Sequence, residues 1–200
     1  MAKSTPGGAQ RFDRDYFQRF YYSRKTRVTN AREMQVRADL IAAVLKHAQL
    51  PVRSVLDAGC GIGLMQTAFK SSLPKARYTG LEASEYLCRR YGWVHGSIDS
   101  FKPAQSFDLL VCYDVLQYLD ESQAAKALAN FGNLARVGLY FSALTRADWR
   151  NNCDRALTDD AVHLRAGDWY RRRLRRHFRY LACGVWIRKS IGVIRWELES

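Results

Sequence analysis

Val55-Leu56-Asp57-Ala58-Gly59-Cys60-Gly61-Ile62-Gly63 is the stretch that decides the fold. Apolar residues end in a carboxylate, and three glycines follow at alternate positions. Glycine lets the backbone turn tightly and approach a ligand without a Cβ in the way. An apolar, helix-forming segment begins at once at Leu64, so its first amide groups would point at whatever lies above the loop. The stretch therefore predicts a buried strand, a ligand-binding turn and a helix.

The glycine spacing of this loop distinguishes between two cofactor classes. The pattern here is G-x-G-x-G, whereas loops that bind nicotinamide dinucleotides use G-x-G-x-x-G. The segment resembles motif I of the class I S-adenosylmethionine-dependent methyltransferases. Asp57 fits that resemblance, because a carboxylate favours the ammonium and sulfonium of this cofactor and meets no pyrophosphate that it would repel. The resemblance implies a methyltransferase enzyme with S-adenosyl-L-methionine as its cofactor.

Three later segments resemble the family's other motifs in the expected order. Glu82 ends the second strand, where the family places an acid on the ribose hydroxyls. In Gly96-Ser97-Ile98-Asp99, the resemblance implies Ile98 against adenine and Asp99 at its exocyclic amine. Residues 107–116 resemble motif IV, beside the methionine end of the cofactor. The cofactor-binding residues implied by the resemblance are Asp57, Gly59, Cys60, Gly61, Gly63, Glu82, Ala83, Ile98, Asp99 and Tyr113.

Each of these motifs also has a plain structural interpretation. The glycines could form a turn with no ligand, and Glu82 could be a solvated strand end. Asp99 could cap a helix, and Asp114 could cap the turn that follows motif IV.

Hydrophobic patterning predicts alternating strands and helices along the chain. Strands are expected at 53–57, 76–82, 93–96, 107–113 and 138–143, and helices at 12–22, 31–49, 64–73, 84–91, 121–135 and 168–178. The segment 145–167 reads as irregular. Two closely spaced strands, 180–187 and 192–198, should pair as an antiparallel hairpin. The fold class is α/β: a three-layer, Rossmann-like sheet, mostly parallel, closed by a C-terminal hairpin and preceded by N-terminal helices.

The predicted organisation is a flexible tail over residues 1–11 and one methyltransferase domain over residues 12–200. Within that domain, residues 12–53 form N-terminal helices, and residues 146–178 form the segment expected on the acceptor side. No apolar run approaches the roughly 20 residues that span a bilayer. The five cysteines are scattered, with no C-x-x-C pair, so we expect no metal site and a reducing, cytoplasmic location.

Positive charge is concentrated in the two flanks of the chain, which has a formal net charge of +13. Residues 1–53 carry 11 Lys and Arg against 4 Asp and Glu, and residues 146–200 carry 13 against 7, while the middle is neutral. This distribution favours an acidic partner, although it could simply keep the protein soluble. We expect a small acceptor, anionic or aromatic, methylated at an O, N or C atom. The alternatives are an RNA methyltransferase that uses the basic flanks, and a non-catalytic cofactor-binding protein.

Catalytic residues are hard to identify, because methyl transfer is a displacement that depends mostly on positioning the nucleophile. Motif IV reads Cys112-Tyr113-Asp114-Val115, which lacks the prolines of enzymes that methylate nucleobases. Candidates for a base are His163, Tyr113 and Asp114, and His163 could equally be a surface histidine. The acceptor should lie near Tyr16, Tyr21, Tyr22 and the segment 148–169. The arginines at 171, 172, 175 and 176 are expected on the outer face of a helix.

Overall fold

The computed structural model describes residues 11–193. A seven-stranded sheet with the order β3-β2-β1-β4-β5-β7-β6 forms its centre. The strands are β1 (Ser54–Ala58), β2 (Arg77–Glu82), β3 (Val94–His95), β4 (Phe107–Tyr113), β5 (Ala135–Ser142), β6 (Phe178–Ala182) and β7 (Val185–Arg188). The first five strands are parallel, and β7 pairs antiparallel with both β5 and β6. The predicted mostly parallel α/β sheet, closed by an antiparallel hairpin, is confirmed.

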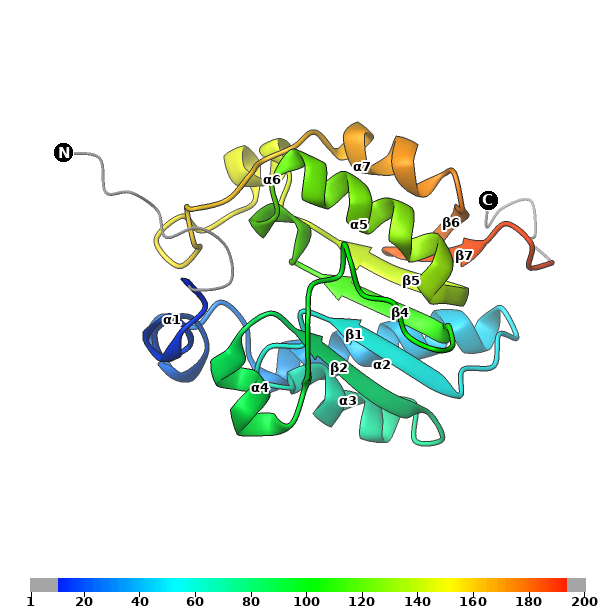
Figure 1. Ribbon diagram of the computed structural model, residues 1–200, viewed down its shortest axis with the longest axis horizontal. Helices are drawn as coiled ribbons and strands as arrows, with labels where there is room; N and C mark the ends of the chain where they lie inside the picture. Colours follow the sequence, from blue (N-terminus) through cyan, green and yellow to red (C-terminus); the bar gives the residue numbers. More distant parts are fainter. Residues whose placement is uncertain (1–10, 194–200) are drawn as a thin grey trace.

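Helices cover both faces of this sheet and give three layers (Figure 1). The helices are α1 (Arg14–Phe17), α2 (Ala31–His47), α3 (Leu64–Ser72), α4 (Glu85–Tyr91), α5 (Glu121–Leu134), α6 (Arg146–Asn151) and α7 (Gly167–Leu174). Helices α5 and α7 lie over one face, and α2 and α3 lie over the other. A π-helical turn, Gln18–Tyr22, continues α1, and a 3-10 turn, Leu116–Tyr118, follows β4.

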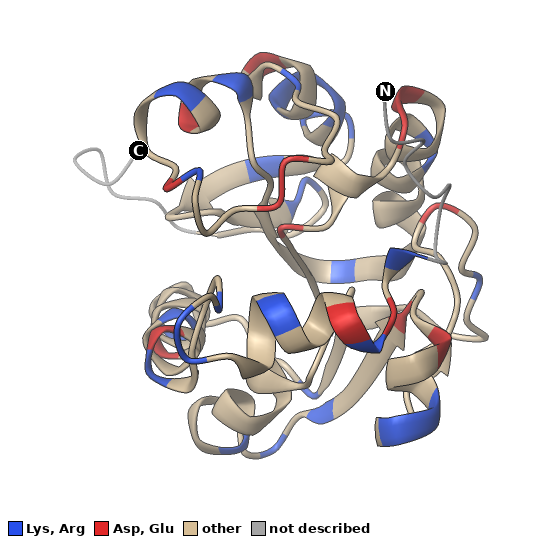
Figure 2. Ribbon diagram, turned by 90° about the vertical axis from the view of Figure 1, so that its left-hand side faces the viewer, with Lys and Arg blue, Asp and Glu red and all other residues tan. Residues whose placement is uncertain are grey.

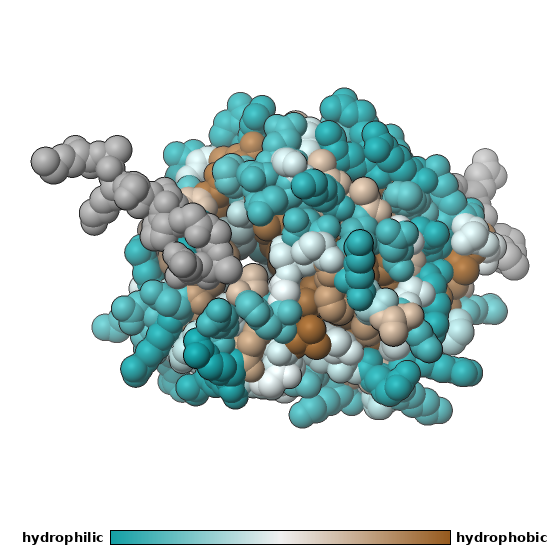
Figure 3. Space-filling model, viewed as in Figure 1, coloured by the Kyte–Doolittle hydropathy of each residue, from teal (hydrophilic) through white to brown (hydrophobic). Residues whose placement is uncertain are grey.

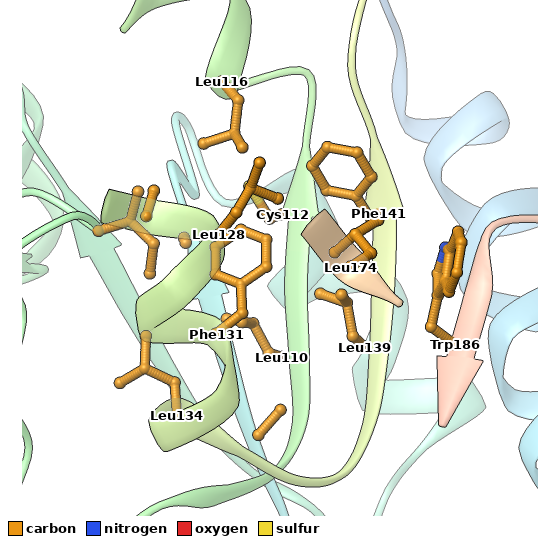
Figure 4. Close-up of a cluster of buried hydrophobic side chains, with 14 of the residues drawn as sticks. Leu110, Cys112, Leu116, Leu128, Phe131, Leu134, Leu139, Phe141, Leu174 and Trp186 are labelled. Carbon is orange, nitrogen blue, oxygen red and sulfur yellow. The ribbon is translucent and has the colours of Figure 1, made fainter. Parts of the chain in front are cut away.

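Two buried clusters, one on each face of the sheet, form the core. The first joins strands β4 and β5 to α5 and α7, and Figure 4 shows Phe131 of α5 between Leu128 and Leu110 near its centre. The second cluster joins α2 and α3 to the opposite sides of β1, β4 and β5. Since both faces are covered, strands β1 and β4 are buried along almost their whole length, as expected of parallel strands. On the face viewed in Figure 3, hydrophobic surface is confined to small areas among hydrophilic residues.

Local capping signals in the sequence set several helix ends where they were expected. The side chain of Asn30 accepts the Glu33 N–H at 3.1 Å and begins α2. Ser84 caps α4, and Gly92 ends that helix in the left-handed conformation. Asp120 and Gln123 form a reciprocal capping box at the start of α5.

Three predictions near the C-terminal end were wrong in detail. The hairpin turn falls at Cys183 and Gly184, both at positive φ, so β6 and β7 both arise from the stretch predicted as one strand. The second predicted strand, 192–198, lies almost wholly outside the described residues. The helix over 168–178 stops at Leu174, and Phe178 begins β6 instead. Helix α6 lies in the segment that was expected to be irregular. The sequence feature that indicates this helix is the reciprocal cap between Thr145 and Asp148 at its start.

The chain's N-terminal segment forms a helical unit as predicted, beginning with Asp13, which caps α1. The predicted tail, 1–11, lies outside the described residues except for Arg11. Among residues 11–193, no helix is both long enough and apolar enough to cross a membrane.

Replacing Phe131 with alanine should lower the free energy of unfolding by about 3–5 kcal/mol, because Phe131 is fully buried and would leave a cavity between α5 and β4. Urea unfolding followed by circular dichroism measures this loss. The matched control is Val36→Ala, since Val36 is 63% exposed and should change stability by less than about 0.5 kcal/mol. Equal losses in both variants would contradict this assignment of the core.

Candidate functional site

The glycine loop, Gly59 to Gly63, lies at the carboxyl end of β1, and the surroundings of its three glycines differ. All three have positive φ, at 74°, 55° and 80° for Gly59, Gly61 and Gly63. A Cβ on Gly59 would lie 2.4 Å from the side chain of Val115, and one on Gly63 would lie 2.9 Å from the ring of Trp93. A Cβ on Gly61 would meet nothing within 4 Å. The loop is therefore packed against protein at its two ends and faces open space at its middle.

Glu82 fixes this loop in place from the end of the neighbouring strand β2. One carboxylate oxygen accepts the Gly61 N–H at 2.9 Å, and the other accepts the N–H groups of Ala83 and Ser84 at 2.9 and 3.0 Å. Burial raises the pKa of Glu82, and these three hydrogen bonds oppose that rise. Each oxygen still has lone-pair capacity for a further donor.

Asp57 is buried beneath the loop, and its carboxylate accepts a hydrogen bond of 2.5 Å from the hydroxyl of Tyr78. Burial raises the pKa of Asp57 to about 7, the Tyr78 hydrogen bond opposes the rise, and the nearby charge of Glu82 adds to it. Two buried carboxylates close to one loop repel each other unless a cation joins them. The site is therefore electrostatically prepared for a positively charged ligand.

Two cavities meet over the loop. The smaller, of 260 Å³, is lined by Glu82, Ala83, Ser97, Ile98 and Val115, among others. The larger, of 370 Å³, extends past Asp57 and Cys60 to α6 and the segment that follows it. The residues that line both cavities are Tyr21, Gly59, Gly61, Tyr113, Asp114 and Tyr118. A ligand that filled both cavities would pass over the middle of the glycine loop.

Aromatic residues from the N-terminal segment form one wall of the smaller cavity: Phe12, Tyr16, Phe17 and Tyr21. The Tyr16 hydroxyl donates to that of Tyr118 at 3.0 Å, which ties the segment to the turn after β4. Arg11 forms an ion pair with Asp159, and so connects the N-terminal segment to the loop between α6 and α7. In Figure 1 these two segments, far apart in sequence, come together at the same side of the sheet.

Most of the predicted site residues come together in these walls. Asp57 and Cys60 line the larger cavity, Glu82, Ala83 and Ile98 line the smaller one, and the residues shared by both include Gly59, Gly61, Tyr113 and Asp114. Three other predicted residues are not among the lining residues.

Those three residues lie elsewhere for identifiable reasons. Gly63 packs on Trp93 at the base of the loop. Asp99 accepts a hydrogen bond from the Ser97 hydroxyl, at the start of the turn that follows β3. His163 is exposed, and its backbone N–H donates to the Gln117 carbonyl at 2.7 Å.

The structure adds residues to which the sequence gave no role. Gln117 and Tyr118 line the larger cavity from the 3-10 turn after motif IV, and the only signal for them was that they follow Asp114 closely. Arg165 is buried and donates to the carbonyls of Leu116 and Leu119, which holds that turn against the loop that precedes α7. No sequence pattern distinguished this arginine from the exposed ones. Among residues 11–193, no cluster of His, Cys, Asp and Glu could hold a metal ion.

Comparison with known proteins decides the class of this site. Residues 55–138 match a family model described as a methyltransferase domain. The chain contains a class I methyltransferase domain. This domain spans the glycine loop, β2, the Ile98 turn and β4, which are the segments that carried the resemblance. The predicted family and the prediction of an enzyme are confirmed, and S-adenosylmethionine is the cofactor of this class.

Solved structures of other methyltransferases share the fold. The N-methyltransferase NodS from Bradyrhizobium japonicum, in complex with S-adenosyl-L-homocysteine, has a TM-score of 0.63 at 17% identity, and the match covers 88% of this chain and 98% of that one. Magnesium protoporphyrin IX methyltransferase (ChlM) from Synechocystis PCC 6803, with bound S-adenosylmethionine, has a TM-score of 0.58 at 16% identity, covering 94% and 100%.

A third neighbour is longer than this methyltransferase. The plantazolicin methyltransferase BpumL, bound to a substrate analogue and S-adenosyl-L-homocysteine, has a TM-score of 0.52 at 17% identity, and the match covers 72% of this chain and 57% of that one. A search of curated protein sequences found no significant match. At such identities, the likeness to solved structures concerns the fold alone.

The buried Asp57 should make the unliganded methyltransferase less stable as the pH rises. Its folded-state pKa of about 7 exceeds the ordinary 3.8, so the folded state holds more protons than the unfolded state between about pH 4 and 7. Stability is therefore lost as the pH rises through that window. Asp57→Asn removes this loss, so the stability of this variant relative to the natural protein should grow by about 3 kcal/mol between pH 4.5 and 7.5.

Urea unfolding across this pH range measures the effect, with Asp160→Asn as control, since Asp160 is exposed. A stability difference between Asp57→Asn and the natural protein that does not change with pH would contradict the buried, proton-binding state of Asp57.

Proposed function

We propose that this protein transfers the methyl group of S-adenosylmethionine to a small-molecule acceptor held in the larger cavity. The observation that carries the proposal is the meeting of the two cavities over Gly59 and Gly61. A cofactor with its adenosyl part in the smaller cavity would place its sulfonium where the larger cavity begins. Both volumes are of the order of known small-molecule sites, which occupy roughly 300–1,000 Å³.

The adenosyl end has suitable partners in the smaller cavity. The Glu82 carboxylate is held by three backbone N–H groups and can still accept both ribose hydroxyls. The buried side chain of Ile98 and the neighbouring Ala83 offer apolar surface to the adenine ring. Asp99 lies outside the cavity wall and accepts the Ser97 hydroxyl with one carboxylate oxygen, which leaves its other oxygen able to accept a further donor.

The methionine end would lie on the Asp57 side of the loop. Its ammonium supplies the cation that two buried carboxylates, Asp57 and Glu82, lack. The open middle of the loop, at Gly61, leaves room for the ligand to approach the backbone. The sulfonium methyl would then face Tyr113 and Asp114, the residues at the end of β4 that line both cavities.

The reaction itself is a displacement, in which the acceptor atom attacks the methyl carbon and S-adenosylhomocysteine leaves. The cofactor supplies the reactive methyl, so the protein's main contribution is to hold the two reactants in line and exclude water. Tyr113 and Asp114 are the predicted bases that touch this region, whereas His163 lies outside both cavity walls.

Binding of S-adenosylhomocysteine should raise the melting temperature and should weaken at least tenfold in Glu82→Gln. This substitution removes the charge and replaces one acceptor oxygen with a donor that faces backbone N–H groups, and hydrogen bonds to charged groups contribute about 1.5–3 kcal/mol. Isothermal titration calorimetry measures the affinity, and circular dichroism checks that the variant is folded.

The control variant is Glu85→Gln, which removes an exposed carboxylate three residues away on α4 and should bind as the natural protein does. Stabilisation by NADH but not by S-adenosylhomocysteine would overturn the proposed cofactor. Binding without methyl transfer to any small molecule or RNA would favour the alternative of a non-catalytic binding protein.

A further inference from the structure

The larger cavity is acidic, although the protein as a whole is basic. The carboxylates in its wall belong to Asp57, Asp114, Asp148, Asp154 and Asp159. Within residues 11–193, the one Lys or Arg that lines it is Arg27, which is exposed. Figure 2, which looks at this side of the molecule, shows Asp and Glu in the central loops among scattered Lys and Arg.

Most of these carboxylates already have partners. Asp159 is paired with Arg11, and Asp148 closes the reciprocal cap with Thr145 and also accepts from Asn152 at 2.9 Å. Asp57 belongs to the proposed cofactor site. Asp114 remains as the carboxylate deep in the cavity with oxygen capacity to spare.

Asp114 has an unusual backbone and a central place. Its φ is +54°, a conformation that costs a non-glycine residue energy and that recurs at functional sites. The Ser142 hydroxyl donates to its carboxylate at 3.3 Å, and it lines both cavities. Burial raises the pKa of Asp114, which Tyr113, Arg37 and Ser142 partly oppose. Arg37 is engaged elsewhere, with its guanidinium 4.1 Å from the Tyr113 ring centre and a hydrogen bond to Tyr140.

Gln117 supplies an independent sign of a missing hydrogen-bond donor. Gln117 is among the residues that line the same cavity, it is only 4% exposed, and its Oε1 is buried with no hydrogen-bond partner among the described residues. A buried acceptor left without a partner costs about 1–3 kcal/mol, and a ligand N–H would recover this energy when the Gln117 amide turns toward the cavity. The backbone of Gln117 is held in place, because its carbonyl accepts the His163 N–H.

Aromatic rings complete the wall: Tyr21, Tyr113 and Tyr118 all line the larger cavity. An ammonium group is attracted to the face of an aromatic ring, by about 2 kcal/mol or more when it is shielded from water. A carboxylate, an unpaired amide oxygen and tyrosine rings together form a set that recognises a cationic N–H donor. The same set would repel a phosphate or carboxylate group.

We propose that the acceptor is a small amine, bound as an ammonium between Asp114 and these rings, with Gln117 accepting one of its N–H groups. This inference rests on the proposed function. Asp114 takes one proton from the ammonium, and the amine lone pair that this frees forms the N–C bond to the methyl carbon. The C–S bond breaks with its electron pair going to sulfur, which gives S-adenosylhomocysteine and the protonated, N-methylated acceptor. The proton that Asp114 took up then leaves to solvent.

This inference reverses the charge that the sequence suggested for the acceptor. The basic flanks place few of their charges at the cavity: Arg11 is paired with Asp159, the Arg165 guanidinium is turned to backbone carbonyls, and Arg27 is the lining arginine among residues 11–193. The arginines of α7 at 171 and 172, and those at 175 and 176 just beyond it, are exposed. An RNA phosphate or a carboxylated metabolite would therefore meet Asp114 and Asp148 in the cavity.

The test uses three probes of similar shape but different charge: phenethylamine, 2-phenylethanol and phenylacetate. The protein is first saturated with S-adenosylhomocysteine, and each probe is titrated by calorimetry. We expect the amine to bind at least tenfold more tightly than the alcohol or the acid. With S-adenosylmethionine in place of its product, mass spectrometry should detect methylated phenethylamine.

Two variants connect the preference to the structure. Asp114→Asn removes the charge and keeps the shape, and asparagine tolerates positive φ well, so the fold should survive. It should reduce the preference for the amine at least tenfold, and Gln117→Leu should weaken amine binding without weakening alcohol binding. Glu85→Gln, on exposed α4, should change neither.

Equal binding of the three probes, or tighter binding of phenylacetate, would overturn the amine inference while leaving the proposed function intact. An amine preference that survives in Asp114→Asn would also overturn it. Failure of the initial S-adenosylhomocysteine saturation is a separate result, and it would count against the proposed function itself.

Discussion

The site depends on one carboxylate, that of Glu82, and its hydrogen bond from the Gly61 N–H. This contact joins the ends of β1 and β2 and fixes the middle of the glycine loop, while Val115 and Trp93 pack against its two ends. A loop with three residues at positive φ has many conformations to lose, and side-chain contacts from neighbouring strands select one of them. The space over Gly61 stays open because Glu82, Val115 and Trp93 hold the loop around it in one conformation.

Keeping acids at this place has a cost in stability. Both Asp57 and Glu82 are buried, and burial raises the pKa of each. Tyr78 and three backbone N–H groups offset part of this cost. Such an arrangement is expected where a cationic ligand completes the charge balance, because residues that are optimal for binding are often unfavourable in the empty protein.

The walls of the larger cavity come from segments that are far apart in the chain. Tyr21 precedes the sheet, Asp114 and Gln117 follow β4, and Asp159 lies in the loop after α6. The Arg11 ion pair and the Tyr16 hydrogen bond to Tyr118 connect these segments across the cavity. A methyltransferase fold can thus change its acceptor through loops, while the glycine loop and the sheet stay the same.

Periodicity, glycine spacing and caps in the sequence determined the order of the elements, the parallel sheet and the residues around the glycine loop, because these are local patterns. Tertiary structure alone decided where the hairpin turns at Cys183, and that Phe178 belongs to a strand, since both depend on packing against β5 and α5. It also decided the charge of the larger cavity. Net charge counts every charged residue of the chain equally, whereas the charge of a cavity depends on the few residues that line it. Asp114 and Gln117 come together in this wall only after the chain has folded.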